Sequence, residues 1–290
     1  MSETTGVWTK CCCISKRLDG KLAIVTGSST GIGLSTAGEL ARRGAKVIMA
    51  CRNIPKAEAA RKCLLERYGT NNPESVTTDI ASQEVMASLS PIEDDQLMIE
   101  KLDLASLESV RELAGGSVPH FRNWTFSSIM LGWQPNSAPS RIIIISSIGH
   151  YAGRLSKPDL QLPESEYGEV KAYFQSKLAN VLHAVELGER LHNSGVTVVS
   201  LHPGAVNTEL DRNTTDFGLK TFRKLTKPLF VSPWKGTQTI LYTVLSDNLI
   251  SGGYYSNCTL KEPSSTVKNK EERKWFWNRT YELLGIENKL

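Results

Sequence analysis

Apolar segments and amphipathic segments alternate through the first part of this chain, and that alternation restricts the fold more than any other feature of the sequence. KLAIVT at 21–26 and KVIMA at 46–50 are short, nearly continuous apolar runs, typical of parallel strands in a sheet covered on both faces. Each is followed by a segment with helical spacing, GLSTAGELARR at 33–43 and PKAEAARKCLLERYG at 55–69. This order predicts βαβ units and therefore a parallel sheet in an α/β fold.

The rest of the chain continues this pattern, with two irregularities. Further strands are predicted at 97–104, 141–147 and 196–204, and a long helix at 166–193. Residues 71–96 are polar and contain prolines, so they predict a surface insertion before the third strand. The interval 105–141 is shorter than the roughly 45 residues that a helix, a strand, a second helix and their loops need. One strand-helix unit is therefore missing or compressed, and TFSSIML at 125–131 is the candidate strand there.

The segment TGSSTGIG at 26–33 directly follows the first predicted strand and opens the first predicted helix. Glycines in such a place let the backbone approach a pyrophosphate, while the free amides and dipole of the helix N-terminus attract the anion. Gly27 would permit the tight turn, Gly31 the close approach, and Gly33 the packing of helix on strand. A purely structural turn is the alternative, but the position favours a dinucleotide site. The residues predicted to bind the cofactor here are Gly27, Ser28, Ser29, Thr30, Gly31, Ile32 and Gly33.

The end of the second predicted strand indicates which dinucleotide would bind. An acidic residue there accepts the ribose hydroxyls of NAD, but this chain has Cys51, Arg52 and Asn53. Arg52 suits a 2′-phosphate, because a guanidinium matches phosphate geometry, so Arg52 and Asn53 predict NADP (NADPH). A solvated surface arginine is the alternative. Asp103, at the end of the third predicted strand, is equally suited to approach the adenine or to cap the next helix.

Tyr173 and Lys177 are four positions apart in a predicted helix, so they share one face, one turn apart. A lysine charge close to a phenol favours the phenolate, which suits general acid/base catalysis, and Lys177 could also hold a cofactor ribose. The pair alone is common in ordinary helices. Ser147 strengthens the catalytic interpretation, because it ends an apolar strand at the sheet edge where ligands bind and can bond a substrate oxygen. Ser146 would point the other way and is the weaker candidate.

HPGAVNTEL at 202–210 ends a further predicted strand. Pro203 and Gly204 would turn the chain there, and Thr208 could bond a nicotinamide carboxamide; a plain turn before a helix is the alternative. His150 and His202 are isolated in sequence and lack the partner spacing of a metal site, so structural roles and no metal are predicted.

Composition narrows the partners and the compartment. The net charge of +4 is spread along the chain without a basic stripe, so nucleic acid is not a predicted partner. No apolar run is long enough for a membrane helix, and the first residues lack a signal-peptide core, which predicts a soluble cytoplasmic protein. The cysteines show neither a CxxC pattern nor a disulfide framework and are interpreted as reduced thiols. Residues 1–19 are expected to form a disordered tail before one domain at 20–290, with acylation of Cys11, Cys12 and Cys13 as the alternative.

Together these segments resemble the short-chain dehydrogenase/reductase family. The matching motifs are TGSSTGIG, LDLA at 102–105, IISS ending at Ser147, YFQSK at 173–177 and HPGAVNT at 202–208. The chain is most similar to the retinol dehydrogenase group of that family, through ELARRGAKVIMACRN, SAPSRIIIISS, YFQSKLANVL and WNRTYELLGI. The resemblance covers nearly the whole chain. It implies a Rossmann-type doubly wound parallel sheet, NADP(H), and interconversion of an alcohol with an aldehyde or ketone.

The resemblance also implies roles for the site residues. In this family a tyrosine exchanges a proton with the substrate oxygen, a serine steadies that oxygen, and a lysine binds the ribose and favours the tyrosinate; Tyr173, Ser147 and Lys177 match. The implied substrate is a small lipophilic carbonyl or alcohol such as a retinoid. Apolar residues between 209 and 233 would form a lid over it, or an amphipathic helix on the core or a membrane. A peripheral position on the endoplasmic reticulum membrane is the alternative to a cytoplasmic one, although the N-terminal membrane helix common in retinol dehydrogenases is not found here.

One family feature is missing from the sequence. The NNAG motif that ends the central strand in the family does not occur, and the position of the family's active-site asparagine would fall at Pro119. No asparagine is therefore carried over, and Asn123 nearby has no support. These departures agree with the short interval at 105–141. They keep open a second hypothesis, a catalytically impaired protein that binds a dinucleotide or a partner.

Overall fold

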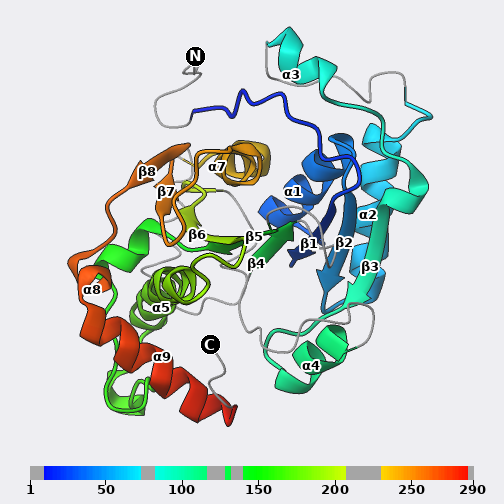
Figure 1. Cartoon of the computed structure of the whole chain (residues 1–290). Helices are drawn as coiled ribbons and strands as arrows, with labels where there is room; N and C mark the ends of the chain where they lie inside the picture. Colours follow the sequence, from blue (N-terminus) through cyan, green and yellow to red (C-terminus); the bar gives the residue numbers. More distant parts are fainter. Residues whose placement is uncertain (1–9, 73–81, 116–127, 132–139, 207–229, 287–290) are drawn as a thin grey trace.

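The computed structural model describes residues 10–72, 82–115, 128–131, 140–206 and 230–286, without the side chains of 114–115 and 128–131. The strands in these ranges form one eight-stranded sheet in the order β3-β2-β1-β4-β5-β6-β7-β8 (Figure 1). The strands are β1 Leu22–Thr26, β2 Lys46–Cys51, β3 Leu97–Lys101, β4 Ser128–Leu131, β5 Ser140–Ile145, β6 Val196–His202, β7 Tyr254–Ser256 and β8 Thr259–Lys261. The α/β class and the single sheet are as predicted.

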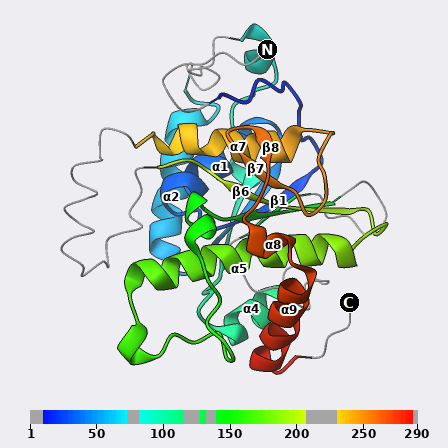
Figure 2. The ribbon, with the colours of Figure 1, turned by 90° about the vertical axis from the view of Figure 1, so that its left-hand side faces the viewer.

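Helices cover both faces of this sheet (Figure 2). The helices are α1 Gly31–Arg42, α2 Ile54–Tyr68, α3 Gln83–Ala87, α4 Leu107–Gly115, α5 Glu169–Arg190, α7 Pro233–Leu245, α8 Ser265–Lys268 and α9 Lys270–Leu284, with 3-10 helices η1 Asp94–Gln96, η2 Ile148–Ala152 and η3 Glu164–Glu166. α1, α2 and α7 lie on one face, and α4, α5 and α9 lie on the other. In the described part of the chain, no helix is both long and apolar enough to cross a membrane.

The isoleucine run of β5 shows why the strands read as continuous apolar segments. Ile143 is fully buried in the core that α1 and α7 cover. Its neighbours Ile142 and Ile144 point to the other face and pack with Trp277 of α9. Burying each of these side chains stabilises the fold by about 1.5 to 3 kcal/mol. Both faces of the strand therefore require apolar residues, as a sheet covered on two sides does.

β4 is where the sheet departs from the predicted parallel arrangement. It pairs antiparallel with both β1 and β5, whereas β1, β2 and β3 pair in parallel, as do β5, β6 and β7. The segment 132–139 between β4 and β5 is shorter than the dozen or so residues that a parallel crossover needs, so the two strands form a hairpin. The predicted parallel sheet is confirmed for β1 to β3 and for β5 to β7, but β4 runs the other way, and so does β8, which forms a hairpin with β7. At the sheet edge where β1 ends, β4 begins.

Two segments expected to lie loosely on the surface are packed where the structure describes them. Of the predicted tail 1–19 the structure describes residues 10–19, and the Lys10 amide donates to Asn257 Oδ1 at 2.6 Å. Cys12 is buried in the core, and its amide donates to Gln238 Oε1 on α7. The predicted insertion 71–96 buries Val85 and Ile92 in its second half. Apolar side chains within these polar segments reach the core, which composition averaged over a segment does not reveal.

Candidate active site

Side-chain hydrogen bonds fix the end of β5 against helix α5. Ser146 Oγ donates to the main-chain oxygen of Lys177 at 2.7 Å, and Asn180 Nδ2 donates to the oxygen of Ile145 at 2.9 Å. Ser146 therefore points into the interior rather than to solvent, as the alternation along the strand predicted. These two contacts set the height of α5 relative to the strand that leads to Ser147.

Ser147 is the N-cap of η2, and its hydroxyl accepts from the amide of Gly149 at 3.2 Å. Gly149 lies against α5: a Cβ at this position would come within 2.7 Å of Phe174 Cδ1 and 3.4 Å of Tyr173 Cε1. A side chain at residue 149 would push η2 away from the helix. The glycine thus brings the serine turn and the tyrosine ring together.

Tyr173 and Lys177 lie on one face of α5, as their spacing predicted. Lys177 Nζ is 5.5 Å from the centre of the Tyr173 ring, within the range of a cation–π contact. Both side chains are half-buried. Burial lowers the pKa of the Lys177 ammonium, because leaving water disfavours the charged form. A positive charge is therefore held beside the phenol at a cost in solvation.

Backbone conformation builds the loop between β1 and α1. Gly27 and Gly31 have φ of +64° and +59°, in the left-handed region that glycine adopts without strain. A Cβ on Gly33 would lie 2.6 Å from the Gly27 oxygen, so only glycine allows the first turn of α1 to close on the loop. Thr30, the N-cap of α1, makes no side-chain capping bond within the described residues. The helix N-terminus keeps the amides and the dipole that attract a phosphate.

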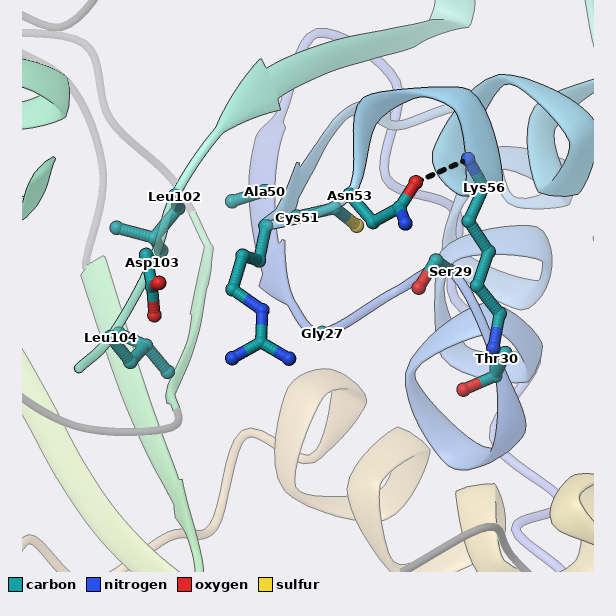
Figure 3. Close-up of a pocket in the computed structure, with 11 residues that line it drawn as sticks. Gly27, Ser29, Thr30, Ala50, Cys51, Asn53, Lys56, Leu102, Asp103 and Leu104 are labelled. Atoms are coloured by element: carbon teal, nitrogen blue, oxygen red, sulfur yellow. Dashed lines mark hydrogen bonds between the residues drawn. The ribbon is translucent and has the colours of Figure 1, made fainter. Parts of the chain in front are cut away.

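A cavity of about 360 Å³ opens beside this loop (Figure 3). It is lined by Gly27, Ser29, Thr30, Ala50, Cys51, Arg52, Asn53, Lys56, Leu102, Asp103 and Leu104. The ends of β1, β2 and β3 and the start of α1 thus converge on one site. Six residues predicted to bind a cofactor line it: Gly27, Ser29, Thr30, Arg52, Asn53 and Asp103.

Two of these cavity residues also accept hydrogen bonds from the backbone that stabilise local structure. Asn53 Oδ1 accepts from the Lys56 amide at 2.9 Å and caps α2, as Figure 3 shows. Asp103 Oδ1 accepts from the Ala105 amide at 3.0 Å, which closes a turn before α4. Asp103 therefore lines the cavity but does not cap α4, whose N-terminal capping bond is accepted by Ser106 Oγ.

Other predicted residues lie elsewhere. Ser28 is fully buried and donates to the Val25 oxygen at 2.9 Å, so its hydroxyl faces the interior. Ile32 packs against the core that α1 and α7 cover, and Gly33 supports the loop from behind. Pro203 and Gly204 follow β6, with Gly204 at φ +94°. Thr208 and Asn123 lie outside the described residues.

Lys56 also lines the cavity, although it was not among the residues predicted from the sequence to bind a cofactor. It stands in the first turn of α2, and its side chain runs toward Thr30 (Figure 3). The signal was available: a lysine four positions after Arg52, at the start of a helix whose N-cap borders the predicted phosphate site. Two cationic side chains therefore face the cavity where one was predicted.

Comparison with known proteins gives consistent matches. The family model described as short chain dehydrogenase matches residues 21–104. Human retinol dehydrogenase 13 is 36% identical over 293 residues, covering 95% of this chain and 88% of that protein. Among solved structures, an uncharacterised protein from Mycobacterium paratuberculosis matches with a TM-score of 0.64 at 24% identity over 95% of this chain and 97% of that one. A variant of actinorhodin polyketide ketoreductase with NADPH matches with a TM-score of 0.51 at 15% identity, over 83% and 97%.

Proposed function

We infer the function from the premise that this chain belongs to the short-chain dehydrogenase/reductase family, in its retinol dehydrogenase-like group. It is an oxidoreductase of that type. We propose that it interconverts an alcohol with an aldehyde or ketone, that NADP(H) is its cofactor, and that its substrate is lipophilic, such as a retinoid. Two features together support the proposal. One is a cavity lined by cationic side chains that suits a phosphate, and the other is the series of contacts that runs from Ser147 through Gly149 to Tyr173.

The residues present fit a dinucleotide. The glycine loop leaves room for a pyrophosphate, since among the described residues, its two chain neighbours aside, no heavy atom lies within 4 Å of a Cβ placed on Gly27. Arg52 and Lys56 line the cavity at the end of β2, where a 2′-phosphate would bring negative charge. Asp103 follows β3, not β2. At the end of β3 its carboxylate suits an adenine amine or a ribose hydroxyl. This charge arrangement supports NADP over NAD.

The chain's own residues account for proton transfer. A bound NADPH would supply the hydride, so the protein has to orient the substrate oxygen and deliver a proton to it. Tyr173 is the proton donor, and the phenolate left behind is stabilised by the ammonium of Lys177, 5.5 Å from the ring centre. Ser147 donates a hydrogen bond to the same substrate oxygen. In the oxidative direction the same groups act in reverse.

Two exposed side chains next to Ser147 support a lipophilic substrate. Ile148 is 63% exposed and Tyr151 is 49% exposed, and both belong to η2. Apolar surface of this kind beside a catalytic serine favours a substrate with a hydrocarbon body. The proposed lid at 209–233 lies almost wholly outside the described residues. Association with a membrane surface stays a prediction.

A second candidate function rests on the antiparallel β4. Since β4 begins where a parallel strand would end, the central edge of the sheet carries other residues than in a parallel arrangement. If the cleft there is misshapen, the protein binds a dinucleotide without turning over a carbonyl.

One assay separates these functions. The purified protein is given NADPH with all-trans-retinal and with a panel of long-chain aldehydes. We expect reduction that falls by about 10²- to 10⁴-fold in Tyr173→Phe, because the general acid is gone. Tyr167→Phe, which changes an exposed tyrosine just before α5, serves as the matched control and keeps full activity. A Tyr173→Phe variant as active as the wild type would refute this mechanism, and NADPH binding without turnover would favour the second function.

A further inference from the structure

His150 is a fully buried histidine in η2, between the end of β5 and the start of α8. Its ring lies 4.0 Å from that of Tyr151 and 4.5 Å from that of Tyr254 on β7. His202, at the end of β6, is close enough for the two imidazoles to disfavour each other's charge. The His150 ring has no role in the proton transfer proposed above.

Both ring nitrogens have partners that fix the tautomer. Nδ1 lies 2.8 Å from the main-chain oxygen of Ser147, and the amide of Ser264 points at Nε2 from 3.3 Å. A carbonyl oxygen only accepts and an amide N–H only donates, so Nδ1 carries the proton and Nε2 is bare. Burial lowers the pKa of His150, which keeps the ring neutral. The imidazole thus links two segments that are far apart in the sequence.

The contact holds Ser147 at two points. Its main-chain oxygen accepts from the His150 ring and also from the His150 amide at 3.1 Å. Its hydroxyl accepts from the Gly149 amide, which leaves the hydroxyl proton available for an oxygen outside the turn. Gly149 in turn rests on Tyr173 and Phe174. Any shift of η2 would therefore change the relation between the serine hydroxyl and the tyrosine ring.

We propose that His150 is a positioning residue for the reaction: a neutral imidazole whose Nδ1–H bond to the main-chain oxygen of Ser147 holds that residue in register with Tyr173, while the amide of Ser264 fixes the tautomer. This inference rests on the proposed function and adds a residue to it. The ring acts through Ser147 and does not touch the reacting atoms. Its task is geometric, because hydrogen-bond donors to a substrate oxygen lose effect when they are misplaced by about 1 Å.

Two amide substitutions separate the two hydrogen bonds. The side-chain nitrogen of His150→Asn can occupy the place of Nδ1 and keep the bond to Ser147, whereas His150→Gln can place its amide oxygen near Nε2 and keep the bond to Ser264. His150→Leu removes both. We expect kcat to fall tenfold or more in His150→Leu and His150→Gln but by less than threefold in His150→Asn. The Kd for NADPH should stay within twofold in all three, because the cavity beside β1 lies on other elements.

The control is His192→Asn, an exposed histidine in the turn after α5, which should leave kcat unchanged. A folded His150→Leu protein that keeps wild-type kcat would overturn the proposal. So would an asparagine variant no better than the glutamine variant, because the bond to Ser147 would then not be the one that matters.

A second measurement needs no turnover. Nitrogen-15 NMR of histidine-labelled wild-type protein distinguishes a protonated ring nitrogen from a bare one. We expect one buried histidine, identified by its loss in His150→Asn, with the proton on Nδ1. A proton on Nε2 would overturn the inference even if the enzyme is active. A proton on Nδ1 in a protein without turnover would contradict the proposed function but not the tautomer inferred for His150.

Discussion

Two parts of the sheet hold their site residues in different ways. In the dinucleotide half, residues 20–115, the site is built by backbone: left-handed glycines, a helix N-terminus and strand ends that meet at one cavity. Residues 140–206 carry the proposed catalytic residues and are called the catalytic half; there side chains tie separate elements together, as Ser146 does with Lys177 and His150 with Ser264. A backbone-built site depends on local conformation, whereas a tied site depends on tertiary contacts. The two halves should therefore fail under different changes.

The largest difference between the two halves should be in how much stability each loses at low pH. Burial lowers the pKa of His183 and of His202 from 6.5 to about 4, and the dinucleotide half has no histidine. Between pH 6.5 and about 4 the unfolded chain binds protons that the folded chain does not, so stability is full above pH 6.5 and is lost as the pH falls toward 4. The loss is on the order of 1 kcal/mol per pH unit for each histidine.

Hydrogen exchange at pH 7 and pH 5 measures this difference. Amides of α5 and β6 should lose more protection than those of β1 and β2. His183→Leu should flatten the pH dependence, since it removes one of the three histidines of residues 140–206 whose pKa burial lowers. Equal loss in both halves would contradict the comparison.

A methyl group in the glycine loop should damage the dinucleotide half alone. Gly33→Ala places a carbon 2.6 Å from the Gly27 oxygen, so the loop has to move. The Kd for NADPH should rise at least tenfold, about 1.4 kcal/mol, while the unfolding of the catalytic half is unchanged. Gly168→Ala is the control, because its nearest contact is 4.0 Å away. Wild-type affinity in Gly33→Ala would show that close backbone approach is not what binds the cofactor.

Removing a tie should damage the catalytic half alone. Ser146→Ala leaves the Lys177 oxygen without its side-chain donor and loosens α5 against β5, which costs about 1 kcal/mol. We expect kcat to fall about three- to tenfold with an unchanged Kd for NADPH. Ser194→Ala breaks a bond of similar length, to the Leu191 oxygen in the turn after α5, and should have no effect on kcat. A change in NADPH affinity as large as the change in kcat would argue that the halves are not independent.

The smallest predicted effect is a gain in thermal stability, whereas the changes above all cause losses. Lys177→Met replaces a half-buried ammonium with an apolar chain of similar length, so activity should be lost while Tm rises by about 1 to 3 °C. Calorimetry measures it, with Lys171→Met, an exposed lysine on the same helix, as the control. A lower Tm in Lys177→Met would mean that the ammonium stabilises the fold rather than straining it.

The same contrast explains what the sequence could predict. The glycine loop, Arg52 and the face shared by Tyr173 and Lys177 follow from local spacing, and the structure places them as expected. The short interval at 105–141 was visible too, but the reversed direction of β4 depends on how β4 and β5 connect. The tertiary partners of His150 and the burial of Cys12 have no local signal, because they join residues more than a hundred positions apart.

The central claim is that the dinucleotide half binds NADPH beside a reversed β4. Fluorescence titration of the wild type and Arg52→Ala with NADPH and NADH tests it directly, with Arg154→Ala as an exposed control. Saturable binding that favours NADPH tenfold or more, with the preference lost in Arg52→Ala alone, is the predicted result. A folded protein that binds neither cofactor, or that prefers NADPH equally well without Arg52, would contradict it.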